Sequence, residues 1–144
     1  MSIHIERTAL LPYTALQMYE LVNDVQRYPE FLPWCAATSL LESSETALMA
    51  SITVAKLGVK QTFSTRNEMI PGEQIRLSLV DGPFSHMTGI WTFKALNESA
   101  CKISLEMDFD YKGMLIKATL GPLFTQAANT MVDAFCARAK QLYG

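Results

Sequence analysis

The chain has 144 residues, of which 49% are hydrophobic and 18% are charged, and its formal net charge is −2 at pH 7. This length suits one domain with a core of its own, and no linker or repeat divides residues 1–144. The acidic balance argues against DNA or RNA binding that depends on neutralising phosphates. Four basic residues on neighbouring predicted strands form either a modest local patch or a solvated face: Lys56, Lys60, Arg66 and Arg76.

The cysteines indicate the redox compartment. Cys35, Cys101 and Cys136 lie far apart and form no Cys-x-x-Cys motif. An odd number of cysteines without a secretory leader predicts reduced thiols and a cytoplasmic protein. No stretch approaches the roughly 18 uncharged apolar residues that a membrane span needs, so we expect no transmembrane segment.

The first predicted elements along the chain are short. Residues 3–6 alternate between apolar and polar side chains, which predicts a short strand. Apolar residues then recur at helical spacing from Tyr13 or Thr14 to about Asn23, which predicts a helix. Two prolines within residues 28–35 forbid a long regular helix, so we expect a helical turn followed by a bend.

From Ala36 the hydrophobic period becomes two, which predicts antiparallel strands with one buried face and one exposed face. Short polar or Gly/Pro turns join them, and a parallel crossover would need about a dozen residues or more. The strands therefore form one antiparallel meander. The six predicted strands cover residues 36–43, 47–57, 59–69, 74–80, 86–96 and 101–111.

After Gly113 the period turns helical, and apolar positions from Leu120 to Leu142 form the stripe of a long helix packed along the sheet. Gly121 and Pro122 are expected to kink or restart this helix. The element order predicts an α+β fold in which about seven curved strands surround one long helix, with two short helices after the first strand. Because a bent sheet meets a straight helix well only near its middle, we expect an apolar hollow between them.

Recognisable catalytic and metal-binding motifs are absent from the sequence: there is no Gly-rich phosphate loop, no His-Glu-x-x-His and no Gly-x-Ser-x-Gly. His4 and His86 take the outward phase of their strands. Glu106, Asp108 and Asp110 do the same at a spacing near 7 Å, which favours a solvated face over a cation site. We therefore predict a non-enzyme with no catalytic residue, no metal and no cofactor.

Large apolar side chains expected to border the hollow are the candidate ligand-binding residues. A hydrophobic small molecule would occupy a cavity of about 300–1,000 Å³. Phe31 and Trp34, which lie between two prolines, either fill the core or form a lid. Phe84 falls at a predicted hairpin tip, where a core role is less natural. The candidates are Phe31, Trp34, Phe63, Met87, Trp91, Leu120 and Phe124.

Several strings carry a resemblance that covers essentially the whole chain. The most specific runs from Tyr28 to Cys35 and reads Tyr-Pro-Glu-Phe-Leu-Pro-Trp-Cys. It is accompanied by Leu79 to Phe84, by Gly89 to Phe93 and by the ending Met131 to Ala139. Together these strings resemble the START-like family of polyketide cyclases and coenzyme Q-binding proteins.

The resemblance implies a helix-grip, Bet v 1-like fold and two functions. One is the binding of ubiquinone or a related lipid to support respiration. The other belongs to a branch of bacterial ribosome-association toxins, which bind the large ribosomal subunit and block 70S formation and translation initiation. This second function leaves open a small antitoxin protein as a further partner. The cyclase activity belongs to distant members whose catalytic groups have no match here.

Overall fold

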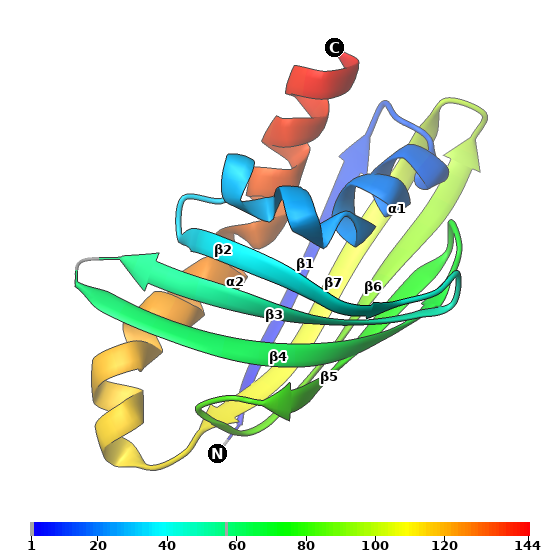
Figure 1. The fold of residues 1–144 in the computed structure, drawn as a ribbon. Helices are drawn as coiled ribbons and strands as arrows, with labels where there is room; N and C mark the ends of the chain where they lie inside the picture. Colours follow the sequence, from blue (N-terminus) through cyan, green and yellow to red (C-terminus); the bar gives the residue numbers. More distant parts are fainter. Residues whose placement is uncertain (1, 57) are drawn as a thin grey trace.

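A computed structural model describes residues 2–56 and 58–144 and contains one antiparallel sheet of seven strands in the order β1-β7-β6-β5-β4-β3-β2. Every pair of neighbouring strands is antiparallel. The strands are β1 (Ile3–Leu11), β2 (Cys35–Ser43), β3 (Ala47–Lys56), β4 (Val59–Ile70), β5 (Gln74–Asp81), β6 (Phe84–Asn97) and β7 (Ala100–Tyr111). The predicted meander is confirmed, and β1 extends it by pairing with β7 (Figure 1).

The predicted strand limits agree with the structure to within about two residues, except at the first strand. Position 57, the predicted end of the second meander strand, lies outside the described residues. The first strand was expected to be short, yet it pairs with β7 from Ile3 opposite Phe109 to Leu11 opposite Cys101. In its second half, residues 7–11, polar and apolar residues no longer alternate in the sequence, and the apolar Leu10 is 71% exposed. Backbone pairing with β7 extends the strand where the hydrophobic pattern no longer does.

Two short helical segments follow β1, as predicted. α1 (Ala15–Asn23) begins at Thr14, whose hydroxyl accepts a hydrogen bond from the Gln17 amide while the Gln17 side chain accepts one from the Thr14 amide. This capping box satisfies two free amides at the helix start. The second segment, the 3₁₀ helix η1 (Val25–Glu30), begins earlier than the helical turn expected within 28–35. Burial of Val25 and Tyr28 holds it directly against the end of α1.

The long helix α2 (Met114–Tyr143) runs through Pro122 without restarting. Of the two predicted outcomes, a kink or a restart, the structure shows no restart, and Figure 1 shows that the helix axis bends in its amino-terminal part. Since proline removes one intrahelical hydrogen bond, a bend lets the helix continue past it. The buried stripe of α2 includes Phe124, Ala128, Val132 and Phe135, which face the sheet.

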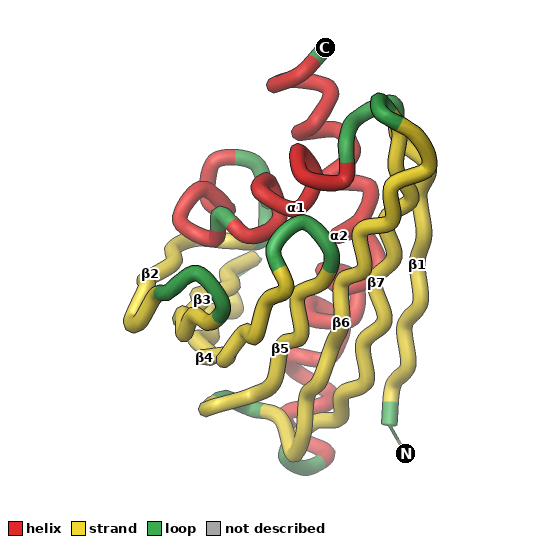
Figure 2. Tube along the Cα trace, turned by 90° about the vertical axis from the view of Figure 1, so that its right-hand side faces the viewer, coloured by secondary structure: helices red, strands yellow, loops and turns green. Residues whose placement is uncertain are grey.

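The sheet curls around α2, so that its concave face and this helix enclose the core (Figures 1 and 2). α1 and η1 lie near the carboxyl-terminal half of α2, where Glu30 of η1 pairs with Arg138 at 2.8 Å. Strand β7 provides the centre of the core, with Ile103 and Leu105 fully buried. The α+β helix-grip architecture predicted from the sequence is confirmed. Within residues 2–56 and 58–144, no helix combines the length and hydropathy that a membrane span requires.

Candidate functional site

A cavity of about 80 Å³ lies between the concave face of the sheet and α2. The sheet contributes side chains such as Phe63 of β4 and Trp91 of β6, and α2 contributes Phe124, Ala128 and Met131. The segment with α1 and η1 closes one end with side chains that include Val22, Tyr28 and Trp34. The expected hollow is therefore present, and its walls come from the elements that the sequence placed around it.

The cavity is far smaller than the expected range of about 300–1,000 Å³. Large side chains of the core fill most of the space between sheet and helix, leaving about 80 Å³. Three methionines, Met87, Met107 and Met131, belong to the lining. Because methionine has three rotatable bonds and adapts to irregular spaces, these side chains are the natural ones to repack around a larger guest.

Most candidate ligand-binding residues lie where the sequence predicted. Trp34, Phe63, Met87, Trp91 and Phe124 all border the cavity.

Phe31 and Leu120 do not border it. Phe31 is half-buried against Phe135, with ring centroids 5.3 Å apart, and the Arg138 guanidinium lies 5.1 Å from the centre of its ring. Leu120 lies one helical turn before Phe124, the first α2 residue in the lining. Both side chains are partly buried and pack against the core without reaching the cavity.

Phe84 was not among the candidate residues, and the expectation that a core role is less natural at this hairpin tip is wrong. The residue is 2% exposed and borders the cavity. Its ring centroid lies 4.8 Å from that of Phe124 and 5.8 Å from that of Phe63. The pairing of β6 with β7 shifts register between Phe84 and His86. This bulge reverses the inward phase, so an even-numbered position joins the odd-numbered Met87 and Trp91 on the buried face.

Few polar groups border the cavity. Thr65 and Asn67 of β4 are 6% and 8% exposed, and the Thr65 hydroxyl donates to Asn67 Oδ1 at 3.2 Å. The Trp34 Nε1 is buried without a hydrogen-bond partner. Tyr28 donates its hydroxyl to the Val22 carbonyl, and burial raises the pKa of this phenol, which keeps it neutral. The described lining contains no Asp, Glu, His, Lys, Arg or Cys, so it suits an apolar guest with a small polar group.

The thiols have the character expected of reduced, inert cysteines. Burial raises the pKa of Cys35 to about 11 and also raises the pKa values of Cys101 and Cys136. All three are free. Because the thiolate is the reactive form, these groups are poor nucleophiles near neutral pH.

The four basic residues do not form one patch. Lys60 pairs in register with Ala55 near one end of β4, whereas Arg66 lies opposite Met49 towards the other end. Six residues of strand separate the two β4 positions by about 20 Å. Arg66 also pairs with Glu42 at 3.4 Å, which neutralises part of its charge. The solvated-face interpretation therefore fits these residues better.

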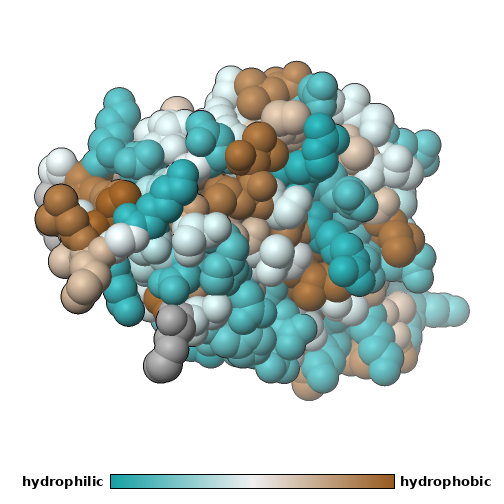
Figure 3. All heavy atoms as spheres, turned by 90° about the horizontal axis from the view of Figure 1, so that it is seen from below, coloured by the Kyte–Doolittle hydropathy of each residue, from teal (hydrophilic) through white to brown (hydrophobic). Residues whose placement is uncertain are grey.

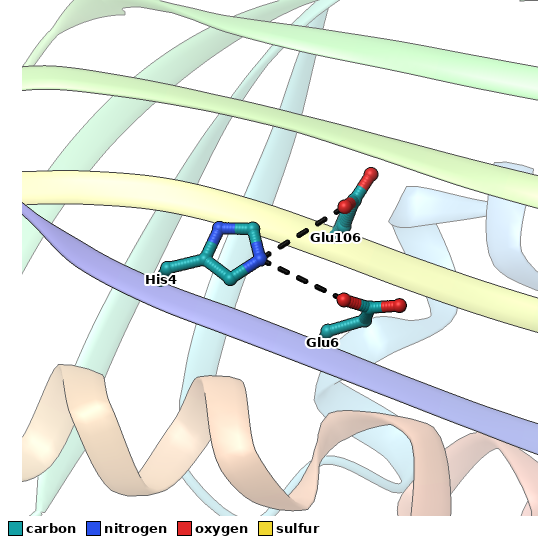
Figure 4. Close-up of side chains that lie close together, drawn as sticks. All are labelled: His4, Glu6 and Glu106. Atoms are coloured by element: carbon teal, nitrogen blue, oxygen red, sulfur yellow. Dashed lines mark ion pairs between the residues drawn. The ribbon is translucent and has the colours of Figure 1, made fainter.

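A cluster of ionisable side chains lies on the outer face of the sheet, away from the cavity. His4 and Glu6 of β1 meet Glu106 and Asp108 of β7, and all four are about half-exposed or more. Figure 4 shows the His4 ring between the two strands with Glu6 and Glu106 on one side of it. The sequence placed three acidic residues on β7 but gave no sign that β1 adds an imidazole and a fourth carboxylate.

The curved sheet, the enclosed helix and the apolar cavity define a START-like, helix-grip protein. A family model described as "Polyketide cyclase / dehydrase and lipid transport" matches residues 11–136, and the chain belongs to this family. The aromatase/cyclase Zhui from Streptomyces sp. R1128 shares the fold, with a TM-score of 0.85 at 18% identity over 98% of this chain and 95% of that one.

Two relatives in sequence bear on function. A protein of Pseudomonas aeruginosa named "Ribosome association toxin RatA" is 63% identical over 144 residues, which is 100% of both chains. A Xenopus laevis protein named "Coenzyme Q-binding protein COQ10 homolog B, mitochondrial" is 27% identical over 99% of this chain and 60% of its own length. The family resemblance predicted from the sequence is confirmed.

Proposed function

We propose that this protein binds an apolar ligand, a quinone or related lipid, in the cavity between the sheet and α2. The observation that carries this proposal is the lining: aromatic, aliphatic and methionine side chains with one hydrogen-bonded polar pair, Thr65 and Asn67. The family description includes lipid transport, and the name of the Xenopus relative adds coenzyme Q as a ligand class.

The size of the cavity determines how such a ligand would bind. A volume of about 80 Å³ does not hold a quinone ring with a tail, so binding must displace lining side chains. Burying about ten tail carbons would contribute roughly 8 kcal/mol at about 0.8 kcal/mol per CH₂. Association itself costs about 4–15 kcal/mol, so the tail has to supply much of the affinity.

Extraction tests this proposal on protein purified from its native host. Organic extraction and mass spectrometry should recover a prenylated quinone or another lipid in a reproducible ratio to protein. A protein denatured and refolded without lipid is the matched control and should release none until it is incubated with a ubiquinone analogue. Repeated extracts without lipid, together with no uptake of the analogue, would contradict the proposal.

We propose ribosome association as a second function, supported by the full-length relative at 63% identity that bears this name. Binding to the large subunit would prevent 70S formation and so inhibit translation initiation in the cytoplasm. The chain has a net charge of −2, so contacts with ribosomal protein or with a few phosphates suit it better than broad rRNA binding. A small antitoxin partner stays a prediction.

Sucrose-gradient profiles after overexpression test this second function. The expected result is a smaller 70S peak with more free subunits, and the chain sedimenting with the large subunit. An unchanged 70S peak at high protein levels would contradict it. A cavity-filling variant, Ala128→Leu, separates the two proposals, because ribosome association through the outer surface should survive a filled cavity.

A further inference from the structure

We propose that His4, Glu6 and Glu106 form a Zn²⁺ site on the outer face of the sheet, joining the edge strand β1 to β7. This site is independent of the cavity and of both functions proposed above. The sequence led us to expect no metal, because the acidic residues of β7 lie too far apart along one strand to share an ion. Pairing with β1 supplies the missing ligands from a second strand.

The orientation of the His4 ring is the first observation. Nδ1 lies 3.1 Å from Asp108 Oδ1, so this nitrogen carries the proton when the imidazole is neutral. The lone pair is then on Nε2, which lies 3.8 Å from Glu6 Oε2 and 3.9 Å from Glu106 Oε1 (Figure 4). A carboxylate that orients a histidine through its other ring nitrogen is the usual outer partner of a zinc-bound imidazole.

The spacing of the three donor atoms is the second observation. All three lie within 4.8 Å of one another. Two ligand atoms at ordinary zinc distances of about 2.0–2.2 Å are about 3.4 Å apart around a tetrahedral ion. The two distances from His4 Nε2, 3.8 and 3.9 Å, need to close by about half an ångström, and the two carboxylate oxygens need to approach each other by at most about 1.4 Å, which rotation of the glutamate side chains can provide. Because all three residues are exposed, a water molecule can take the fourth position.

Charge is the third observation. Glu6 and Glu106 are direct cross-strand partners, a placement in which like charges destabilise a strand pair. Among the described residues, His4 is the one cationic group that pairs with either of them. With a neutral His4, the carboxylates of Glu6, Glu106 and Asp108 leave a strongly negative local field that a divalent cation would offset. Zn²⁺ suits this imidazole and carboxylate set, since carboxylates alone would favour a harder ion.

Nuclear magnetic resonance of the histidine ring nitrogens tests the site, because the chain has only two histidines. Zn²⁺ added to the wild type should shift the His4 Nε2 resonance in a saturable manner with one equivalent, leaving His86 unchanged. His86→Ala is the matched control and should bind as the wild type does. His4→Ala should abolish the binding, Glu6→Gln and Glu106→Gln should weaken it at least tenfold, and Asp108→Asn should weaken it about 10- to 100-fold.

Co²⁺ in place of Zn²⁺ distinguishes this site from adventitious binding at the cysteines. The visible bands of tetrahedral Co²⁺ should appear without the near-ultraviolet band of a cobalt thiolate. Zn²⁺ should also raise the melting temperature of the wild type and of His86→Ala, but not of His4→Ala, since a ligand bound to the folded state stabilises it. A thiolate band, equal shifts at both histidines, or no saturable shift at His4 would overturn the proposal.

Discussion

Phe84 connects the turn between β5 and β6 to the aromatic part of the core. Its ring contacts Phe63 and Phe124 beside the cavity and Phe109 and Tyr111 on the neighbouring strand. Alternation along β6 identified Met87 and Trp91 as inward residues, but it could not identify Phe84. A bulge changes which face of the sheet the following residues point to, and the hydrophobic pattern does not reveal it. The rule that odd-numbered residues of β6 face inward therefore fails beyond the bulge.

Replacing Phe84 with alanine should therefore destabilise the fold by about 3–5 kcal/mol, because the lost ring is fully buried and leaves a cavity. Phe31→Ala is the matched control and should cost less, since Phe31 is only half-buried. Urea unfolding followed by circular dichroism measures both variants. Equal losses of stability for the two would contradict the assignment of Phe84 to the core.

His4 should titrate above its ordinary value. The hydrogen bond and charge of Asp108, followed by the charges of Glu106 and Glu6, raise the pKa of the exposed imidazole. A raised folded-state pKa means that protonated His4 favours the folded state. Its contribution is complete below the unfolded pKa of about 6.5 and is lost as the pH rises through the folded pKa.

A nuclear magnetic resonance titration with a metal chelator present checks this shift, and His86 provides an internal comparison. Asp108→Asn should lower the pKa of His4 by removing its largest cause. A His4 pKa that is the same in the wild type and in Asp108→Asn would show that this contact is not formed in solution.

At the level of elements, the sequence predicted the type and order of every strand and helix, because period-two and helical patterns are strong along this chain. Three features of these elements could not be predicted from the sequence pattern and became clear only in the tertiary structure. The length of β1 depends on its pairing with β7, and the early start of η1 depends on burial of Val25 and Tyr28. The sequence left open whether Pro122 bends or restarts α2, and the structure shows one continuous helix with a bent axis.

The cap at the start of α1 gives a testable prediction for the stability of this element. Thr14→Ala removes one half of the capping box and should cost about 1 kcal/mol of folding free energy. Thr119→Ala is the matched control, because its exposed hydroxyl bonds only to carbonyls of its own helix. Thermal and urea unfolding should show a loss for Thr14→Ala alone. Similar stability for both variants would mean that the cap contributes nothing measurable.

At the scale of the whole molecule, the shape argument predicted the place of the cavity but not its size. The curvature of a sheet around a helix determines where a gap forms, and the lining residues Trp91 and Phe124 follow from the phases of their elements. The remaining volume depends on how core side chains interdigitate, which no sequence period encodes. Ligand binding therefore requires the cavity to enlarge, and we expect the flexible methionine side chains of the lining to change conformation first.

Fluorescence titration with a short-tailed ubiquinone analogue tests this account most directly. The only two tryptophans, Trp34 and Trp91, both border the cavity. A bound quinone should therefore quench the fluorescence in a saturable manner. Each further buried CH₂ of the tail should tighten binding about fourfold, given about 0.8 kcal/mol per group.

Ala128→Leu, which fills the cavity, should weaken binding of this analogue, whereas Ala118→Leu on the exposed side of α2 should not. Quenching that never saturates, or that is the same in Ala128→Leu and the wild type, would contradict ligand binding between the sheet and the helix.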